Sequence, residues 1–360
     1  MDKGGKRVQI RRTYFCMVLL GFIILALDGY GSRTDGQEVL KLFAMKLKLP
    51  LGLNEADMII PEDNPLTPEK AALGQQLYFD TRLSADGTVA CATCHNPRFG
   101  FTDGQPVSTG MKGQRGGRSA PTTVNRVFSS LQFWDGRAAS LEEQAKGPMV
   151  NAIEMGNPSH APVVERLRQI TGYREAFKRA FGTADFTIEH VAKAIACYER
   201  TNLSGNAPFD RFQAGDKTAL SAAAQRGLTL FNQKAQCLRC HSGPNFTDEQ
   251  FHNLGVGITK PQPDLGRYEV SKQEKDKGAF KTPTLRDIAL TAPYFHDGST
   301  QTLEEVVEIY NTGGFKNPFL SKEIVPLNLT AQEKADLVAF LRSLTGEIAF
   351  AVFAPELPRE

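Results

Sequence analysis

The 360-residue chain has little net charge, few cysteines and no sustained strand pattern. Its 42 basic and 40 acidic residues give a net charge of +2. Without a basic excess there is no electrostatic basis for binding nucleic acid, so we expect small molecules or other proteins as partners. Because no long alternation of apolar and polar residues occurs, we predict a mainly α-helical fold. The hydrophobic content of 41% is sufficient for packed cores in two domains.

Long hydrophobic runs are also missing, with one exception near the N-terminus. An uninterrupted apolar run at 15–27 follows five basic residues. The run is shorter than the roughly 20 residues of a membrane-spanning helix, and a basic segment before an apolar run is typical of secretory signals. We predict that residues 1–31 form a signal peptide or an N-terminal membrane anchor, and that the protein is exported to the periplasm.

Four of the six cysteines lie in two copies of the pattern C-x-x-C-H, "CATCH" at 91–95 and "CLRCH" at 237–241. Covalent attachment of haem needs two thiols one helical turn apart and an adjacent imidazole for the iron, and this pattern supplies all three. We therefore predict two covalently attached haem c groups. Their attachment residues are Cys91, Cys94 and the ligand His95 for the first haem, and Cys237, Cys240 and the ligand His241 for the second.

Two other uses of these cysteines must be weighed against haem. The four thiols could form a zinc site, or the cysteines could form a disulfide framework, but both alternatives leave the two trailing histidines unexplained. Of the remaining cysteines, Cys16 lies in the N-terminal segment. Cys197 lies on the apolar face of "VAKAIACYER", which predicts a buried and unreactive thiol.

The sequence is duplicated well beyond the two motifs. Residues 120–144 align without a gap on residues 282–306, so that Trp134 pairs with His296. A duplication of this length indicates two related structural units. The fold class that we predict is therefore mainly α, with two tandem cytochrome c-like domains that each carry one covalently bound haem.

Domain bounds and helices follow from the duplication and from capping signals. The predicted parts are a first domain at 60–204, a second domain at 205–342 and a C-terminal tail at 343–360. We expect the tail to pack back on the first domain, and "SGNAPFDRF" (204–212) to link the two domains. Apolar periodicity and caps predict helices at 67–79, 188–200, 218–231 and 330–344.

Two segments carry a resemblance to a known family. They are "FWDGRAASLEEQAKGPMVNAIEMG" (133–156) and "FKTPTLRDIALTAPYFHDG" (280–298). With them the chain resembles the bacterial di-haem cytochrome c peroxidase and MauG family over residues 60–345. The resemblance implies an oxidoreductase with two c-type haem domains, in which the first haem reacts with hydrogen peroxide and the second stores or relays electrons.

The resemblance also implies the residues of the peroxide site. Trp134 stands at the position of the tryptophan between the two haems. Gln144 and Glu154 match residues that line the peroxide pocket, and Pro148 lies beside them. The chemistry agrees for Glu154, because breaking the O–O bond needs a group that takes a proton from one oxygen and returns it to the other.

The far-side ligand of the second haem distinguishes members of this family. Peroxidases that accept electrons from small cytochromes have a methionine twelve residues after the glycine of H-D-G. Counting from Gly298 gives Tyr310, and MauG is similar in having a tyrosine there. A phenolate stabilises ferric and higher oxidation states of iron, whereas a thioether favours ferrous iron. We expect Tyr310 to bind the second iron; the alternative is a core aromatic of its helix.

Two further departures concern the first haem and a calcium site. Met111 stands where resting peroxidases have a removable histidine, so the first iron is either open, which we favour, or weakly ligated by Met111. The positions that match the calcium site between the haems are Ser119, Thr291 and Pro293. Serine is a weaker ligand than the asparagine of the family, and we still expect one bound calcium.

We expect a periplasmic MauG-like enzyme that reacts with hydrogen peroxide and oxidises a side chain of a partner protein through Trp134 and the second haem. One alternative is a conventional cytochrome c peroxidase, which reduces peroxide with electrons from a small cytochrome or cupredoxin. The other is a di-haem electron carrier with no peroxide chemistry. Lys281 and Arg286 are expected to pair with haem propionates.

Overall fold

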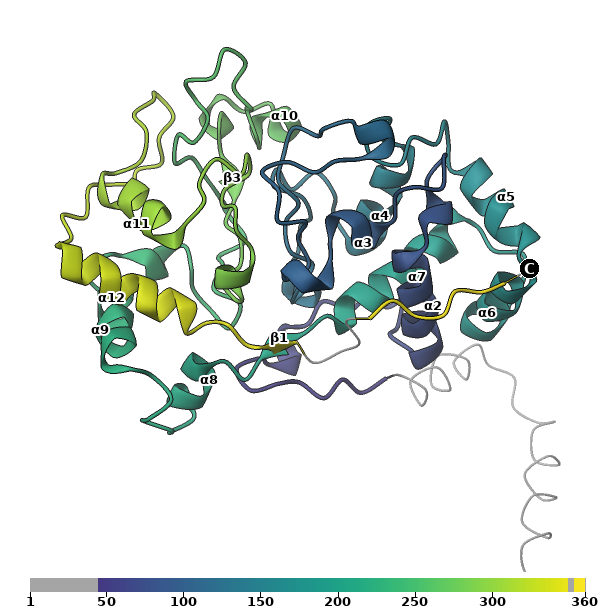
Figure 1. Cartoon of the computed structure of the whole chain (residues 1–360), viewed down its shortest axis with the longest axis horizontal. Helices are drawn as coiled ribbons and strands as arrows, with labels where there is room; N and C mark the ends of the chain where they lie inside the picture. The colour runs from purple at the N-terminus through teal and green to yellow at the C-terminus, as the bar shows by residue number, and fades with distance from the viewer. Residues whose placement is uncertain (1–44, 349–352, 360) are drawn as a thin grey trace, which may run out of the picture. The chain divides into compact units, whose positions relative to one another are not determined.

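The computed structural model describes residues 45–348 and 353–359. The predicted signal peptide or membrane anchor at 1–31 lies outside these ranges. Within them, no helix is both long enough and apolar enough to cross a membrane. The regular structure is mainly helical, as predicted, and the described ranges contain only two short antiparallel sheets of two strands each (Figure 1).

Helices run through both the first half of the described chain, residues 45–203, and the second half, residues 204–348. The α-helices are α2 (Pro68–Phe79), α3 (Cys91–Cys94), α4 (Leu141–Val150), α5 (Ala161–Gln169), α6 (Thr171–Phe181), α7 (Ile188–Thr201), α8 (Pro208–Gln213), α9 (Ala222–Asn232), α10 (Tyr268–Ser271), α11 (Leu303–Asn311) and α12 (Ala331–Arg342). The 3-10 helices are η1 (Glu55–Asp57), η2 (Thr81–Leu83), η3 (Pro97–Phe99), η4 (Met111–Gly113), η5 (Arg126–Phe128), η6 (Cys237–Arg239), η7 (Glu274–Asp276) and η8 (Ile288–Leu290). The strands are β1 (Ser204–Gly205), β2 (Phe251–His252), β3 (Phe280–Lys281) and β4 (Glu347–Ile348).

The first half is built on α2 and α7, which cross at a glycine. Leu73 and Leu77 of α2 and Ile195 of α7 belong to one buried apolar cluster. A Cβ atom on Gly74 would lie 1.9 Å from the carbonyl oxygen of Ala194, so only glycine permits this close approach. The cluster also contains side chains of α4, and it holds α3 and α4 on the same core.

The second half repeats this crossing with α9 and α12. A Cβ atom on Gly227 would lie 2.0 Å from the carbonyl oxygen of Asp336. Beside the crossing, the rings of Phe231 and Phe340 are buried with their centroids 5.0 Å apart. Gly227 stands in the helix before the second motif as Gly74 does before the first, so the duplication in the sequence is also a duplication of a helix pair.

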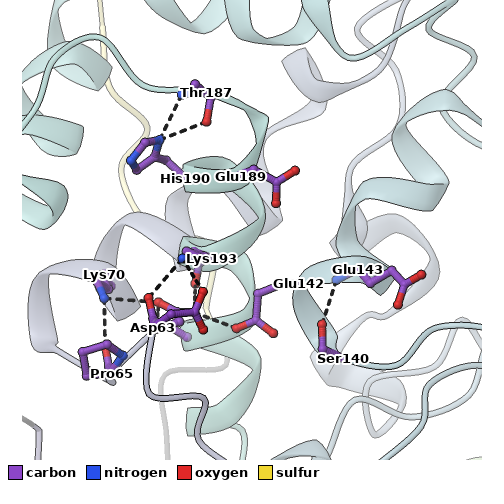
Figure 2. Close-up of polar contacts among 12 residues, drawn as sticks. Asp63, Pro65, Lys70, Ser140, Glu142, Glu143, Thr187, Glu189, His190 and Lys193 are labelled. Carbon is purple, nitrogen blue, oxygen red and sulfur yellow. Dashed lines mark hydrogen bonds and ion pairs between the residues drawn. The ribbon is translucent and has the colours of Figure 1, made fainter.

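Side-chain caps start three helices, two of them at the predicted residues Thr67 and Thr330. Thr67, Ser140 and Thr330 cap α2, α4 and α12. In each case the hydroxyl oxygen accepts a hydrogen bond from the backbone amide of the third helical residue, at 3.3, 3.1 and 3.2 Å. Figure 2 shows the bond between Ser140 and the amide of Glu143. Such a bond satisfies one of the amide donors that a helix start leaves without a partner.

The start of α9 differs from the prediction. This helix begins at Ala222 instead of near Thr218. The hydroxyl of Thr218 donates to Oδ1 of Asp216 at 2.6 Å and is therefore engaged in a local turn. Ser221 caps the helix instead, because its hydroxyl accepts from the amide of Ala224 at 3.2 Å.

The segment before α2 is tied to α7 by polar contacts. Nζ of Lys193 on α7 forms an ion pair with Asp63 at 2.7 Å, and Nζ of Lys70 on α2 donates to the carbonyl of Pro65 at 3.0 Å (Figure 2). On α7, Cys197 is fully buried, and burial raises the pKa of its thiol to about 11. The predicted burial of this thiol is confirmed, and the raised pKa agrees with the expected low reactivity.

The predicted linker at 204–212 is an ordered connection. Its first residues form β1, which pairs with β4 in antiparallel fashion. Further on, Asp210 of α8 forms a buried ion pair with Arg286 at 2.9 Å, and Arg286 also donates to the carbonyl of Pro244 at 2.6 Å. Since these groups occupy Arg286, its expected pairing with a haem propionate is wrong.

The described end of the tail lies along the first half, beside α2 and α6 (Figure 1). The side-chain amides of Gln75 and Gln76 on α2 donate to the carbonyls of Phe353 and Glu356, both at 3.2 Å. These bonds fasten the C-terminal segment to a helix that begins almost 300 residues earlier in the chain.

Candidate functional site

Each C-x-x-C-H motif folds as one helical turn. Cys91 and Cys94 form the two ends of α3, and Cys237 begins η6, so the two thiols of each motif are one turn apart. The histidines follow directly. The amide of His95 donates to the carbonyl of Cys91 and that of His241 to the carbonyl of Cys237, both at 2.9 Å. This geometry fits two thioether bonds and an iron ligand on one face of a haem.

The two motif histidines are oriented in the same way. Nδ1 of His95 lies 3.3 Å from the carbonyl oxygen of Phe101, and Nδ1 of His241 lies 3.0 Å from that of Phe246. When Nδ1–H donates to a carbonyl, Nε2 carries the lone pair that a metal can bind. Burial lowers the pKa of both histidines, so each ring is neutral at neutral pH, as a metal ligand must be.

The arrangement of the cysteines excludes the zinc and disulfide alternatives. All five cysteines in the described part of the chain are free thiols. In that part, the one group of three or more Cys, His, Asp or Glu side chains close enough to share a metal is Cys240, Asp248 and His252. The four motif thiols therefore do not converge on one metal. Cys240 is itself a predicted attachment residue, and Nε2 of His252 is bound to Asp248 at 2.8 Å.

A large, mainly apolar cavity adjoins the second motif, and we call it the second cavity after that motif. It is lined by Cys237, Cys240 and His241, by Tyr310 of α11 and by apolar side chains of α9, α11 and α12. Two thiols and an imidazole on the wall of an apolar cavity fit a covalently bound haem. Tyr310 lines the same cavity as His241, and burial raises the pKa of its phenol. Tyr310 therefore lies on the wall of this cavity, as the predicted ligand role requires, and burial alone favours the protonated phenol.

The three predicted residues of the peroxide pocket lie on α4 and in the turn that follows it. Gln144 and Pro148 belong to α4, and Oε1 of Glu154 accepts a hydrogen bond from Nδ2 of Asn151 at 2.9 Å. Burial raises the pKa of Glu154. Burial also raises the pKa of both thiols of the first motif, and the negative charge of Glu154 adds to this rise. The carboxyl of Glu154 is therefore close to the attachment site of the first haem.

Met111 is packed into the first half. The residue is 8% exposed, and its amide donates to the carbonyl of Glu154 at 2.9 Å. A Cβ atom on Gly156 would lie 2.2 Å from Cε and 2.9 Å from Sδ of Met111, so the thioether packs directly against this glycine. A thioether in such contact with the turn behind α4 favours an open first iron over one ligated by Met111.

Trp134 lies where the two halves meet. Its indole N–H donates to the carbonyl of Ser119 at 2.9 Å, and its own carbonyl accepts from the amide of Lys281 at 2.8 Å. Trp134 also lines the second cavity, together with the three residues predicted for calcium, Ser119, Thr291 and Pro293. The structure thus brings the predicted calcium residues and the tryptophan to the same cavity.

Three charged residues near these sites, of which Arg126 and Glu199 are buried and Glu249 is half-buried, were not predicted from the sequence. Arg126 of η5 lines the second cavity, and Glu249 pairs with Lys281 at 3.0 Å. Glu199 of α7 is 4% exposed, and its Oε2 has no hydrogen-bond partner. One signal was present for Arg126, because the aligned position of the second copy is the neutral Ile288.

Comparison with known proteins agrees with this arrangement. Residues 68–218 match the family described as di-haem cytochrome c peroxidase, and residues 224–345 match the cytochrome c family. The methylamine utilization protein MauG of Methylorubrum extorquens is 46% identical over 301 residues, which cover 83% of this chain and 84% of that protein. The chain belongs to the di-haem cytochrome c peroxidase and MauG family.

Proteins named as peroxidases and proteins described as MauG-like are both similar to this chain. The cytochrome c551 peroxidase of Nitrosomonas europaea is 38% identical over 323 residues, 88% of this chain and 92% of that protein. The crystal structure of a MauG-like protein associated with microbial copper homeostasis has a TM-score of 0.78 at 36% identity, and covers 84% of this chain and 96% of that chain. Membership confirms two cytochrome c domains and an oxidoreductase that acts on peroxide. Proteins named as peroxidases and proteins named MauG are thus both among the relatives of this chain.

Proposed function

We propose that this protein is a MauG-like di-haem enzyme that uses hydrogen peroxide at the first haem and oxidises a side chain of a partner protein by way of the second. The observation that carries this proposal is Tyr310, because it lines the same cavity as His241. An oxygen ligand stabilises the oxidised states of iron, so a haem with this ligand would hold oxidising equivalents instead of accepting electrons from an ordinary donor.

Bound haem would supply the electron transfer and the bond-breaking chemistry at both sites. Glu154 would supply the proton transfer of the peroxide step. Its carboxylate takes the proton from one peroxide oxygen and returns it to the other, which leaves as water. Burial raises the pKa of Glu154, which makes its carboxylate a better acceptor of the first proton than an exposed glutamate would be. The amide of Gln144, on α4, would orient the peroxide.

Trp134 would carry electrons between the two haems. The residue lines the second cavity, and its indole is fixed by the bond to Ser119. We include in the proposal one calcium ion at Ser119, Thr291 and Pro293, which line the same cavity. A periplasmic location, with residues 1–31 as signal peptide or membrane anchor, completes the proposal and agrees with the need for haem attachment outside the cytoplasm.

Rapid mixing of the ferric holoprotein with stoichiometric peroxide tests the proposal. We expect the absorption spectra of both haems to change, because the second haem shares the oxidation. Absence of any spectral change would favour the electron carrier and contradict the proposal. A change confined to the first haem would contradict the sharing step alone.

A conventional cytochrome c peroxidase is the second candidate, and the similarity to the Nitrosomonas europaea peroxidase favours it. The two candidates differ in the reductant. Steady-state consumption of peroxide with a reduced small cytochrome or cupredoxin would be fast for the conventional enzyme and slow for the MauG-like one. If the phenol of Tyr310 distinguishes the MauG-like enzyme from the conventional peroxidase, the Tyr310→Met variant should gain rapid peroxide consumption with the small reductant protein.

A further inference from the structure

The wall of the cavity beside the second motif contains two buried cations, and only one of them is paired with a carboxylate in the described part of the chain. Arg126 from the first half and Lys281 from the second half both line the cavity, and they are 9% and 4% exposed. Nζ of Lys281 pairs with Glu249 at 3.0 Å. Arg126 has no ion pair with any carboxylate in the part of the chain that the structure describes.

The guanidinium of Arg126 is only partly satisfied by the protein. Its Nε donates to the carbonyl of Thr122 at 2.9 Å and its Nη1 to the hydroxyl of Ser129 at 3.4 Å. Both acceptors are neutral, whereas a guanidinium carries five N–H donors and a full positive charge. Burying such a charge without an opposite charge is costly, so the remaining donors call for an anion in the cavity.

Hydrogen bonds join the two cations into one cluster. Glu249 accepts from Lys281 at 3.0 Å and from the hydroxyl of Ser129 at 3.1 Å, and Ser129 is also the partner of Arg126. Burial, followed by the positive charge of Arg126, lowers the pKa of Lys281 to about 8. Glu199 does not supply the second negative charge, because burial raises its pKa to about 8 and keeps it mainly protonated at neutral pH.

The duplication shows that the fold itself does not require this pair of cations. The position of Lys281 is occupied by Ser119 in the first copy, and the position of Arg126 by Ile288 in the second copy. Neither residue carries a charge. The pair is therefore a property of one cavity, and the ligand that it would bind belongs to that cavity.

We propose that Arg126 and Lys281 bind the propionate carboxylates of the second haem, so that the first half completes the binding site of the haem attached to the second half. A haem bound to Cys237 and Cys240 would bring two carboxylates into an otherwise apolar cavity. Arg126 binds a carboxylate through two parallel N–H donors, which a lysine cannot do. This inference rests on the second haem and holds equally for a peroxidase and for a MauG-like enzyme.

The reduction potential of the second haem in the purified holoprotein tests the inference without the use of peroxide. A positive charge beside the haem favours the reduced form, so its loss should lower the potential. We expect R126Q to shift the equilibrium between ferric and ferrous haem at least tenfold towards ferric, which is about 59 mV for one electron. K281Q should shift it in the same direction.

The matched control is R239Q. Arg239 lines the same cavity and has the same charge, but it is exposed to solvent, which screens its field. We expect R239Q to leave the potential nearly unchanged and R126K to restore most of the wild-type value. A shift in R126Q no larger than that in R239Q would overturn the inference, as would equal shifts in R126Q and R126K, since those would indicate a packing role.

A free anion from solution is the other source of a carboxylate. Titration of the wild-type protein with acetate at constant ionic strength separates the two sources. A potential independent of acetate, together with the R126Q shift, supports propionate binding. A potential that changes with acetate would assign the site to an exchangeable anion and overturn the propionate assignment. Should R126Q fail to attach both haems, K281Q and R126K provide the same comparison.

Discussion

The two halves of the molecule have the same scaffold but differ at one position that matters for the iron. Helices α4 and α11 follow the duplicated segment and start after equivalent caps, Ser140 and Thr302. The eighth residue is Pro148 in α4 and Tyr310 in α11. A proline side chain offers no metal-binding atom, whereas a phenol does. A duplicated domain can therefore provide one open and one closed haem through a single residue.

The surroundings of the two C-x-x-C-H motifs are similar in the two halves, which makes the difference between Pro148 and Tyr310 informative. The hydroxyl of Thr122 donates to the carbonyl of Gly100 at 2.6 Å, and that of Thr284 to the carbonyl of Asn245 at 2.7 Å. Both threonines lie in the segment packed beside their motif histidine. Since the supports of the two histidines match, we expect any functional difference between the haems to arise from the far side of each haem and from the surrounding charges.

Exchange at the eighth helical position should have the largest effect. In Tyr310→Met, we expect thioether ligation and a higher reduction potential of the second haem, by on the order of hundreds of millivolts within the range of about 0.8 V that axial ligands span. In Pro148→Tyr, the first haem should lose its open site and react more slowly with peroxide. Near-infrared spectra and spectroelectrochemical titration measure both effects.

The control for this exchange is Tyr294→Phe. Tyr294 also lines the second cavity, but its hydroxyl donates to the carbonyl of Ile288 at 3.2 Å. We expect its removal to leave both haem spectra unchanged. A Tyr310→Met variant with the wild-type spectrum and potential would mean that Tyr310 does not bind the iron.

The second prediction concerns the chemistry assigned to the first half alone. Glu154→Gln should retain both haems but react with peroxide about a hundredfold more slowly, because a positioned acid–base group typically contributes at least that much. Stopped-flow absorbance measures the rate. Glu165→Gln, at an exposed position on α5, serves as the control and should react normally. A wild-type rate in Glu154→Gln would remove this residue from the mechanism.

The third prediction compares two buried carboxyls, each with an oxygen that has no hydrogen-bond partner, Glu199 in the first half and Asp287 in the second. Burial raises the pKa of both, to about 8 for Glu199. A raised carboxyl pKa contributes stability below the unfolded-state pKa, and this stability is lost as pH rises towards the folded-state pKa. Between about pH 5 and about pH 7, the unfolding free energy of the wild type should therefore fall by about 2 kcal/mol more than that of Glu199→Gln.

Asp287→Asn should show the same sign with a smaller effect. This change introduces the residue that the first copy has at the aligned position, Asn125. Urea unfolding at several pH values measures both variants. An unfolding free energy whose pH dependence is unaltered in Glu199→Gln would show that this carboxyl is ionised in the folded protein.

The prediction with the smallest effect concerns whether the hydrogen bonds of Thr122 and Thr284 stabilise the folded protein equally. Thr122→Val and Thr284→Val each remove a buried hydroxyl that donates to a carbonyl and accepts from a backbone amide two residues later. We expect each variant to lose about 1 kcal/mol of unfolding free energy, by similar amounts. Thermal unfolding of the two variants, and of the double variant, shows whether the losses match and add.

Local patterns were sufficient for much of the structure. The two C-x-x-C-H motifs, the caps Thr67 and Thr330 and the buried Cys197 were readable from the sequence, because spacing within one or two turns determines which side chains meet. The start of α9 was misplaced because Asp216 offers Thr218 a competing local bond. That competition depends on geometry that a propensity pattern does not contain.

The order of residues along the chain was enough to establish two haem-attachment motifs on duplicated helical units, since covalent chemistry and helix periodicity act over a few residues. Three other outcomes could be seen only in the folded chain. Arg286 forms an ion pair with Asp210. Arg126 of the first half lines the cavity of the second motif, and Tyr310 lines the same cavity as His241. These outcomes depend on contacts between residues far apart in the chain. The energy of a buried charge is set by its neighbours in space, and the packing of the two halves chooses those neighbours.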